Sequence, residues 1–94
     1  VDELRAEAPG AVPVVAHSAV LAYLERDQRE HVADAIRASG ARWISFEGPR
    51  VLPSIAERAG VGPEWASFLV ALDGEPVGWA QSHGRRVAWT RGLR

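Results

Sequence analysis

The 94-residue sequence contains no cysteine, no methionine and no lysine. Without cysteine the chain can form neither disulfides nor thiolate metal sites, and it cannot use a thiol as a nucleophile. No apolar stretch approaches the roughly 20 residues that a membrane-spanning helix needs. The sequence also lacks the basic start and apolar core of a signal peptide, so we expect a cytoplasmic protein.

The remaining composition, 47% hydrophobic and 24% charged, is typical of one soluble globular domain or part of one. Residues 1–8 resemble the end of a helix that is already under way, and no methionine precedes them. We therefore expect a partial domain. Residues 1–10 are assigned to a helix end and a linker, because Pro9 and Gly10 both stop helices.

The most informative stretch is the apolar run at residues 12–16, which is followed directly by His17 and Ser18. A short continuous apolar run is typical of a strand that is buried on both faces of a parallel sheet. Open α/β sheets bind ligands at the carboxyl ends of such strands. The positions of His17 and Ser18 therefore predict a functional edge.

A helix and a second strand follow this run. The pattern predicts a helix over residues 25–39, ended by Gly40, and a strand over Arg42–Glu47. This order indicates a βαβ unit over residues 11–48, in which the two strands are parallel. Glu47 is then expected at the same edge as His17, roughly 5–8 Å away given the spacing of strands.

The last half of the chain predicts a short helix and loops over residues 49–66 and an antiparallel meander over 67–94. Asp73-Gly74 is a favoured two-residue hairpin turn, and His83-Gly84 is a weaker one. Counting strand directions from these turns places the second turn at the end of the sheet opposite His17. We therefore expect His83 to lie far from the site.

The same turns predict the pairing of side chains across the meander. Phe68 is expected to face Trp79 and to share a sheet face with it. Ala80 is expected opposite Val87 on the other face. Trp89 is expected opposite Gly78, where its ring would lie over bare backbone.

Three stretches of the chain match motifs of a known family. They are Val14-Val-Ala-His-Ser-Ala-Val-Leu-Ala-Tyr-Leu24, then Trp43-Ile-Ser-Phe-Glu-Gly48, then Leu72-Asp-Gly-Glu-Pro and Ser82-His-Gly84 with Trp89. Together they resemble the carboxyl-terminal part of the bacterial domain of unknown function 2332. Full-length members look like Rossmann-type S-adenosylmethionine-dependent methyltransferases. The resemblance implies that residues 12–16 form the fourth strand of that sheet and Arg42–Glu47 the fifth. It places the cofactor-binding segment upstream, so no residue of this chain binds the cofactor.

The order of the last strands has two interpretations. In methyltransferases of this type, an antiparallel last strand lies between the fifth and sixth strands. Two successive tight turns instead favour a simple meander, in which residues 66–72 pair with the fifth strand and residues 86–90 form the edge. We favour the simple meander.

The candidate catalytic residues are His17, as a base or an orienter, and Glu47, as a base or a partner for a substrate cation. Ser18, Tyr23 and Gly48 are the candidate substrate-binding residues. Structural alternatives are that Ser18 caps residues 19–24, that His17 and Glu47 hold loops, and that Tyr23 lies in the core. A Ser-His-acid triad does not fit, because neighbouring strand residues point apart and no Gly-x-Ser-x-Gly elbow exists. Two ligands are too few for a metal site.

The carboxyl-terminal end is basic, since residues 76–94 carry four arginines and no acid. Arg85, Arg86, Arg91 and Arg94 beside Trp89 could suggest contacts with nucleic acid. Arg85 and Arg86 are expected on opposite faces of a strand, which prevents a single patch. We therefore expect neither a nucleic-acid nor a membrane partner.

Two functions remain open for this α/β chain. The first is the substrate-side half of a methyltransferase-like domain with an unknown substrate, inactive in isolation. The second is a non-catalytic binding or assembly module that retains the fold. Because residues 12–16 would lack a neighbouring strand on one side, we also expect self-association through that exposed edge.

Overall fold

The computed structural model describes residues 2–90, which form a five-stranded mixed sheet with helices on one side. In chain order the elements are α1 (Asp2–Glu7), β1 (Val14–Ser18), η1 (Leu21–Tyr23), α2 (Arg26–Ser39), β2 (Arg42–Glu47), α3 (Pro53–Ala56), β3 (Phe68–Leu72), β4 (Glu75–Ala80), η2 (Ser82–Gly84) and β5 (Val87–Trp89). The strand order is β1-β2-β3-β4-β5. Strands β1 and β2 are parallel and all other neighbours are antiparallel, which confirms the βαβ unit and the simple meander.

Strand β1 lies two residues further along the chain than the apolar run suggested. Pro13 has no N–H to donate and precedes the ladder, whereas the backbones of His17 and Ser18 pair with Ser45 and Phe46. His17 and Ser18 are therefore the last residues of the strand and do not form a loop after it. Their side chains point to opposite faces of the sheet.

Helix α2 connects the two parallel strands and covers one face of the sheet. Gly40 ends the helix in the left-handed conformation, with φ of 73°, as the sequence predicts. Val32 and Ala33 each lie one turn before Ile36, and the three residues share the face of the helix that packs in the core. That core is formed by the buried residues Leu21, Ala33, Trp43, Val51, Leu52, Ile55, Leu69, Ala71 and Trp79.

The β3–β4 hairpin departs from the expected pairing. Phe68 lies opposite Ala80, and not opposite Trp79, because the register shifts by one residue beside Pro76. Proline cannot donate to a ladder and is tolerated where a bulge interrupts the pairing. Trp79 therefore packs in the helix-covered core while Ala80 lies on the other face, so the expected faces of both residues were wrong.

The β4–β5 pairing agrees with the expectation. Ala80 lies opposite Val87 and Gly78 opposite Trp89. A Cβ atom on Gly78 would lie 2.9 Å from the Trp89 ring and from the Ala88 carbonyl oxygen. Only glycine leaves room for this close approach.

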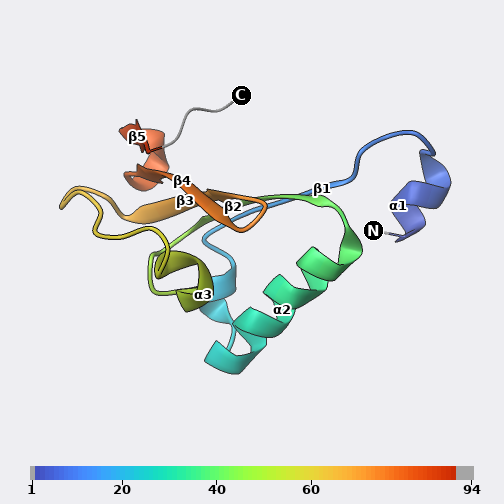
Figure 1. Ribbon diagram of the computed structural model, residues 1–94, viewed down its shortest axis with the longest axis horizontal. Helices are drawn as coiled ribbons and strands as arrows, with labels where there is room; N and C mark the ends of the chain where they lie inside the picture. The colour runs from blue at the N-terminus through green and yellow to red at the C-terminus, as the bar shows by residue number, and fades with distance from the viewer. Residues whose placement is uncertain (1, 91–94) are drawn as a thin grey trace.

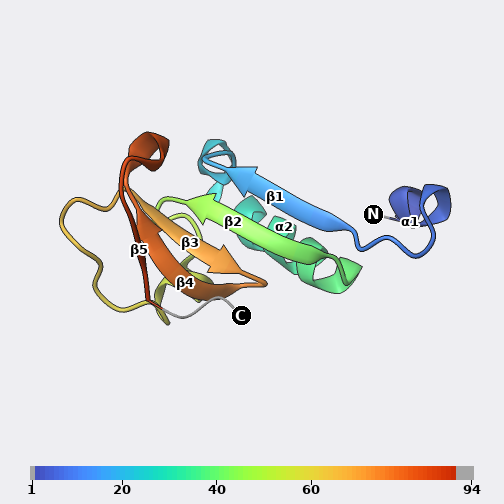
Figure 2. The ribbon, with the colours of Figure 1, turned by 90° about the horizontal axis from the view of Figure 1, so that it is seen from above.

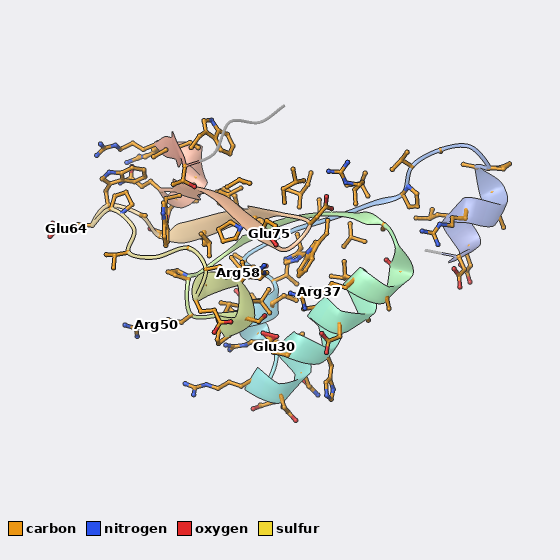
Figure 3. All side chains as sticks on the ribbon, in the orientation of Figure 1. Glu30, Arg37, Arg50, Arg58, Glu64 and Glu75 are labelled. Atoms are coloured by element: carbon orange, nitrogen blue, oxygen red, sulfur yellow. The ribbon has the colours of Figure 1, made fainter. Side chains whose placement is uncertain are left out.

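Helices cover only one face of the sheet in the described residues. In Figure 1, α2 and α3 lie on one side, while β5 and η2 rise on the other. Glu30, Arg37 and Arg58 lie on the helix side (Figure 3). We call the other side the open face; it is formed by the polar residues Ser18 and Arg42 and the apolar residues Val14, Ala16, Ile44, Phe46, Phe68, Val70, Leu72, Ala80, Val87 and Trp89. The exposed members of this face are largely apolar, which is typical of an interaction surface.

The two turns of the meander lie at opposite ends of the sheet. Figure 2 shows η1 and η2 at the same end, where the arrows of β1 and β2 finish. Strand β3 is antiparallel to β2 and begins at this rim, so the Asp73-Gly74 turn lies at the far end. The expectation that His83 lies far from His17 was therefore wrong.

Within residues 2–90, no helix combines the length and the apolar character that crossing a membrane requires.

Candidate functional site

His17 and Glu47 meet on the helix-covered face, where β1 and β2 end. Nδ1 of His17 lies 2.6 Å from Oε2 of Glu47, with only 10% and 4% of the two side chains exposed. The prediction that His17 and Glu47 lie side by side is confirmed. Their contact is shorter than the roughly 5–8 Å expected from the spacing of strands. It is direct because both side chains project to the same face and converge.

Trp43 determines which ring nitrogen of His17 carries the proton. The indole Nε1–H of Trp43 donates to Nε2 of His17 at 2.8 Å. An indole nitrogen can only donate, so Nε2 accepts, and Nδ1 must hold the proton that is donated to Glu47. Both ring nitrogens of this neutral tautomer are engaged by the protein, which leaves none to accept a proton from a substrate.

Glu47 also holds the turn that follows β1. Its Oε2 accepts a hydrogen bond from the Val20 backbone N–H at 3.1 Å, and the Ala19 N–H donates to the Phe46 carbonyl at 2.9 Å. Between them, Ala19 is held at a φ of 54°, in the left-handed region that non-glycine residues rarely adopt. The buried carboxylate therefore shapes the rim beside Ser18.

The expected capping role of Ser18 was wrong. Only a short turn at Leu21–Tyr23 follows β1, and its N-cap is Val20 without a side-chain hydrogen bond. The core placement of Tyr23 was also wrong, since 90% of this residue is exposed. Tyr23 lies outside the pocket described below.

The second oxygen of Glu47 lies in the interior. Oε1 is buried and has no hydrogen-bond partner among the described residues. Glu47, Ser45 and Gly48 line a cavity of about 10 Å³. That volume is comparable to one water and excludes a substrate, so Gly48 lies beside the core and outside the larger pocket.

A larger pocket, of about 670 Å³, lies at the rim on the open face, and we call it the rim pocket. Its lining residues are Ala16, His17, Ser18 and Ala19 from the end of β1, Ile44, Phe46 and Phe68 from the neighbouring strands, and Ser82, His83 and Gly84 from η2. Sequence reasoning identified His17 and Ser18 but missed the η2 side. Strand β3 is antiparallel to β2 and therefore begins at this rim, so β4 returns to the rim and places His83 there. Recognising that direction in the sequence would have predicted the position of His83.

The charged groups of the described residues lie outside the rim pocket. The Arg42 guanidinium and the Trp43 N–H hold the pKa of Asp73 below its usual value, at the opposite end of the sheet. Arg86 lies over the ring of Trp65, 4.4 Å from its centroid. Arg91 and Arg94 of the basic end lie outside the described residues. No group of three or more potential metal ligands occurs within residues 2–90.

Fold and site together define a mixed α/β domain with a ligand-sized pocket beside the carboxyl ends of two parallel strands. The chain belongs to a bacterial family described as "Uncharacterized protein conserved in bacteria (DUF2332)", whose profile matches residues 1–89. This is the family that the sequence motifs indicated. No curated protein and no solved structure matches the chain.

Proposed function

We propose that this chain forms the substrate-binding side of a methyltransferase-like domain and that the rim pocket receives the substrate. The observation that carries this proposal is the pocket of about 670 Å³ beside the carboxyl ends of β1 and β2. Open α/β sheets bind ligands at this place, and small-molecule pockets commonly measure roughly 300–1,000 Å³.

In this proposal His17 and Glu47 are positioning residues. Their side chains are buried on the helix side, and their hydrogen bonds to Trp43 and Val20 fix the end of β1. Ser18 alternates with His17 along the strand and lines the rim pocket from the open face. Ser18 is therefore the residue of β1 that we place against the substrate.

The strand directions support the methyltransferase-like interpretation. The resemblance calls for an antiparallel strand beside the fifth strand, and β3 takes that place next to β2. The chain order differs, because β3 precedes β4 instead of following it. The proposal therefore rests on the directions and on the pocket, and not on the connectivity.

The rim pocket itself does not fit S-adenosylmethionine. Its lining by described residues includes no carboxylate to accept hydrogen bonds from the ribose hydroxyls, and no glycine-rich segment follows β1. The resemblance places the cofactor on residues outside this chain. We therefore derive no methyl-transfer step from the residues present here.

Calorimetric titration of S-adenosylmethionine into a full-length member containing this domain tests the proposal. Saturable binding with one molecule per chain is the expected result. Heats that do not exceed those of dilution would contradict a methyltransferase-like function and favour the second candidate.

The second candidate is a non-catalytic binding or assembly module. It is favoured by the full engagement of both His17 nitrogens and by β1 being an edge strand with apolar, exposed Val14. An unpaired, apolar edge recruits a further strand, so we propose that the chain self-associates along β1. A strictly monomeric species in sedimentation would count against this assembly.

A further inference from the structure

The floor of the rim pocket is aromatic and aliphatic. Phe46 and Phe68 lie side by side with ring centroids 5.0 Å apart and planes tilted by 34°, and Ile44 lies next to them on β2. Aromatic rings favour offset or tilted contacts with further rings over contacts with saturated groups of the same size. The floor therefore suits a flat, unsaturated ligand.

The walls of the pocket supply polar groups without fixed charge. Ser18 lies on one side, and Ser82 and His83 lie on the other. The side-chain hydrogen bonds between described residues engage His17 and do not involve Ser18, Ser82 or His83. Among residues 2–90, no arginine, aspartate or glutamate lines the pocket, which favours a neutral ligand.

Strained backbone occurs beside the same pocket, at Ala19. Among residues 2–90, the non-glycine residues with positive φ are Ala19, Asp73 and His83, at 54°, 53° and 62°. Asp73 belongs to a tight hairpin turn that requires this conformation. His83 belongs in the same way to a tight turn, closed by the Gly84 N–H donating to the Gln81 carbonyl at 3.0 Å. Ala19, which lines the rim pocket at the end of β1, is the residue whose positive φ comes from no such hairpin turn. Strained backbone of this kind occurs preferentially at sites that bind ligands.

We propose that the rim pocket binds a neutral, flat aromatic ring that carries a hydroxyl or carbonyl group at its edge. The ring lies over Phe46 and Phe68, and its polar group exchanges hydrogen bonds with Ser18 and His83. Naming this ligand as the substrate rests on the proposed function. The binding itself needs no cofactor, so it is tested on its own.

Phenol is the probe, and cyclohexanol is its control, since it carries the same hydroxyl on a ring that is not flat. Each is titrated into the ¹⁵N-labelled chain while the amide resonances are followed. We expect phenol to shift the amides of Ser18, Ala19, Phe46 and His83 with a Kd of about 1 mM, as befits a ligand of this size. Cyclohexanol should bind about threefold or more weakly, because it lacks the aromatic contact.

Two variants test the polar contacts. Ser18→Ala removes the hydroxyl, and His83→Asn removes the ring while keeping a residue that tolerates positive φ. Each should weaken phenol binding about three- to tenfold, the effect of one hydrogen bond. His31→Asn, on the exposed side of α2, is the matched control and should leave the Kd unchanged.

Equal affinities for phenol and cyclohexanol would overturn the proposal. So would phenol shifts spread evenly over Val14, Leu72 and Trp89, or binding that neither Ser18→Ala nor His83→Asn weakens. Specific phenol binding without S-adenosylmethionine binding by the full-length protein would leave the ligand class standing and remove the methyltransferase-like function. S-adenosylmethionine binding by the full-length protein without specific phenol binding would remove only the proposed ligand class.

Discussion

Trp43 is a core residue that makes three separate contacts with polar or charged groups. Its indole donates to His17, its backbone N–H donates to Asp73 at 2.8 Å, and the Arg37 guanidinium lies over its ring, 5.3 Å from the centroid. Only 2% of the residue is exposed. The tautomer of the buried imidazole is thus fixed by a side chain that is itself packed in the core.

From this contact we predict the tautomer of His17. The imidazole should carry its proton on Nδ1 near neutral pH, because Trp43 can only donate to Nε2. Long-range ¹H–¹⁵N correlation spectra of the histidine rings measure this directly, with exposed His31 and His83 as internal controls. Trp43→Phe should release Nε2, so a mixture of tautomers is expected in that variant. A proton on Nε2 in the wild-type chain would refute the assignment.

The sequence predicted only those site residues whose positions follow from the ends of strands. His17, Ser18 and Glu47 stand at the carboxyl ends of two strands whose parallel order follows from the βαβ pattern. Trp43 and His83 were missed, because their roles depend on which face a residue occupies and at which end a hairpin turns. Those features are settled by packing between elements that are distant in the chain.

At the scale of elements, the β3–β4 hairpin is fastened to β2 by its turn. The Asp73 carboxylate accepts hydrogen bonds from Arg42 Nε and from the Trp43 N–H, both at 2.8 Å, and the Asp73 N–H donates to the Trp43 carbonyl. The guanidinium of Arg42 and the Trp43 N–H hold the pKa of Asp73 below its usual value of 3.8. The charged form is therefore favoured by folding.

This lowered pKa makes the stability of the hairpin depend on pH. Its contribution should be complete above pH 3.8, the usual value, and should be lost as the pH falls through the lower folded pKa. The contribution is less than about 1 kcal/mol, because the pair is half exposed and water screens it. Asn at position 73 keeps a hydrogen-bond acceptor and tolerates the turn. In Asp73→Asn the free energy of unfolding, measured with urea, should therefore fall less steeply as the pH is lowered below 3.8.

Asp34→Asn is the control for this measurement, because Asp34 forms an exposed ion pair with Arg37 on the surface of α2. An equal change in both variants would mean that the Asp73 contacts contribute nothing specific.

The elements differ in how well their bounds could be predicted. Arg42–Glu47 matches the structure at both ends, since Gly40 and Gly48 bracket its alternating side chains. Strand β1 was misplaced by two residues because apolar character, and not backbone pairing, marked its bounds. The shifted register beside Pro76 was missed because turn counting assumes an uninterrupted ladder.

At the scale of the whole molecule, the chain presents one sheet with two unlike faces. The helix-covered face contains the larger core cluster and the buried His17–Glu47 pair, whereas the open face carries the smaller apolar cluster of Val70, Val77 and Ala80 and ends in the rim pocket. A sheet is normally covered on its apolar face by a second layer. The open face is therefore the side on which we expect ligands or partners to bind.

The two faces of the sheet are coupled through the end of β1, because a buried carboxylate on one face fixes the backbone that borders the pocket on the other. Glu47 holds His17 and Val20 from beneath, and Ala19 is thereby kept left-handed beside the pocket. Glu47→Ala leaves the His17 Nδ1–H and the Val20 N–H without this acceptor and should lower the free energy of unfolding by about 2–4 kcal/mol. Glu47→Gln keeps an acceptor and should lose less, and Glu57→Ala, on the surface, should lose almost nothing.

The backbone chemical shifts of Ala19 test this coupling most directly. We predict left-handed values for Ala19 in the wild-type chain and in Glu57→Ala, and ordinary extended or helical values in Glu47→Ala. Left-handed values that persist in a folded Glu47→Ala chain, or that are missing from the wild type, would show that the buried carboxylate does not shape the rim pocket.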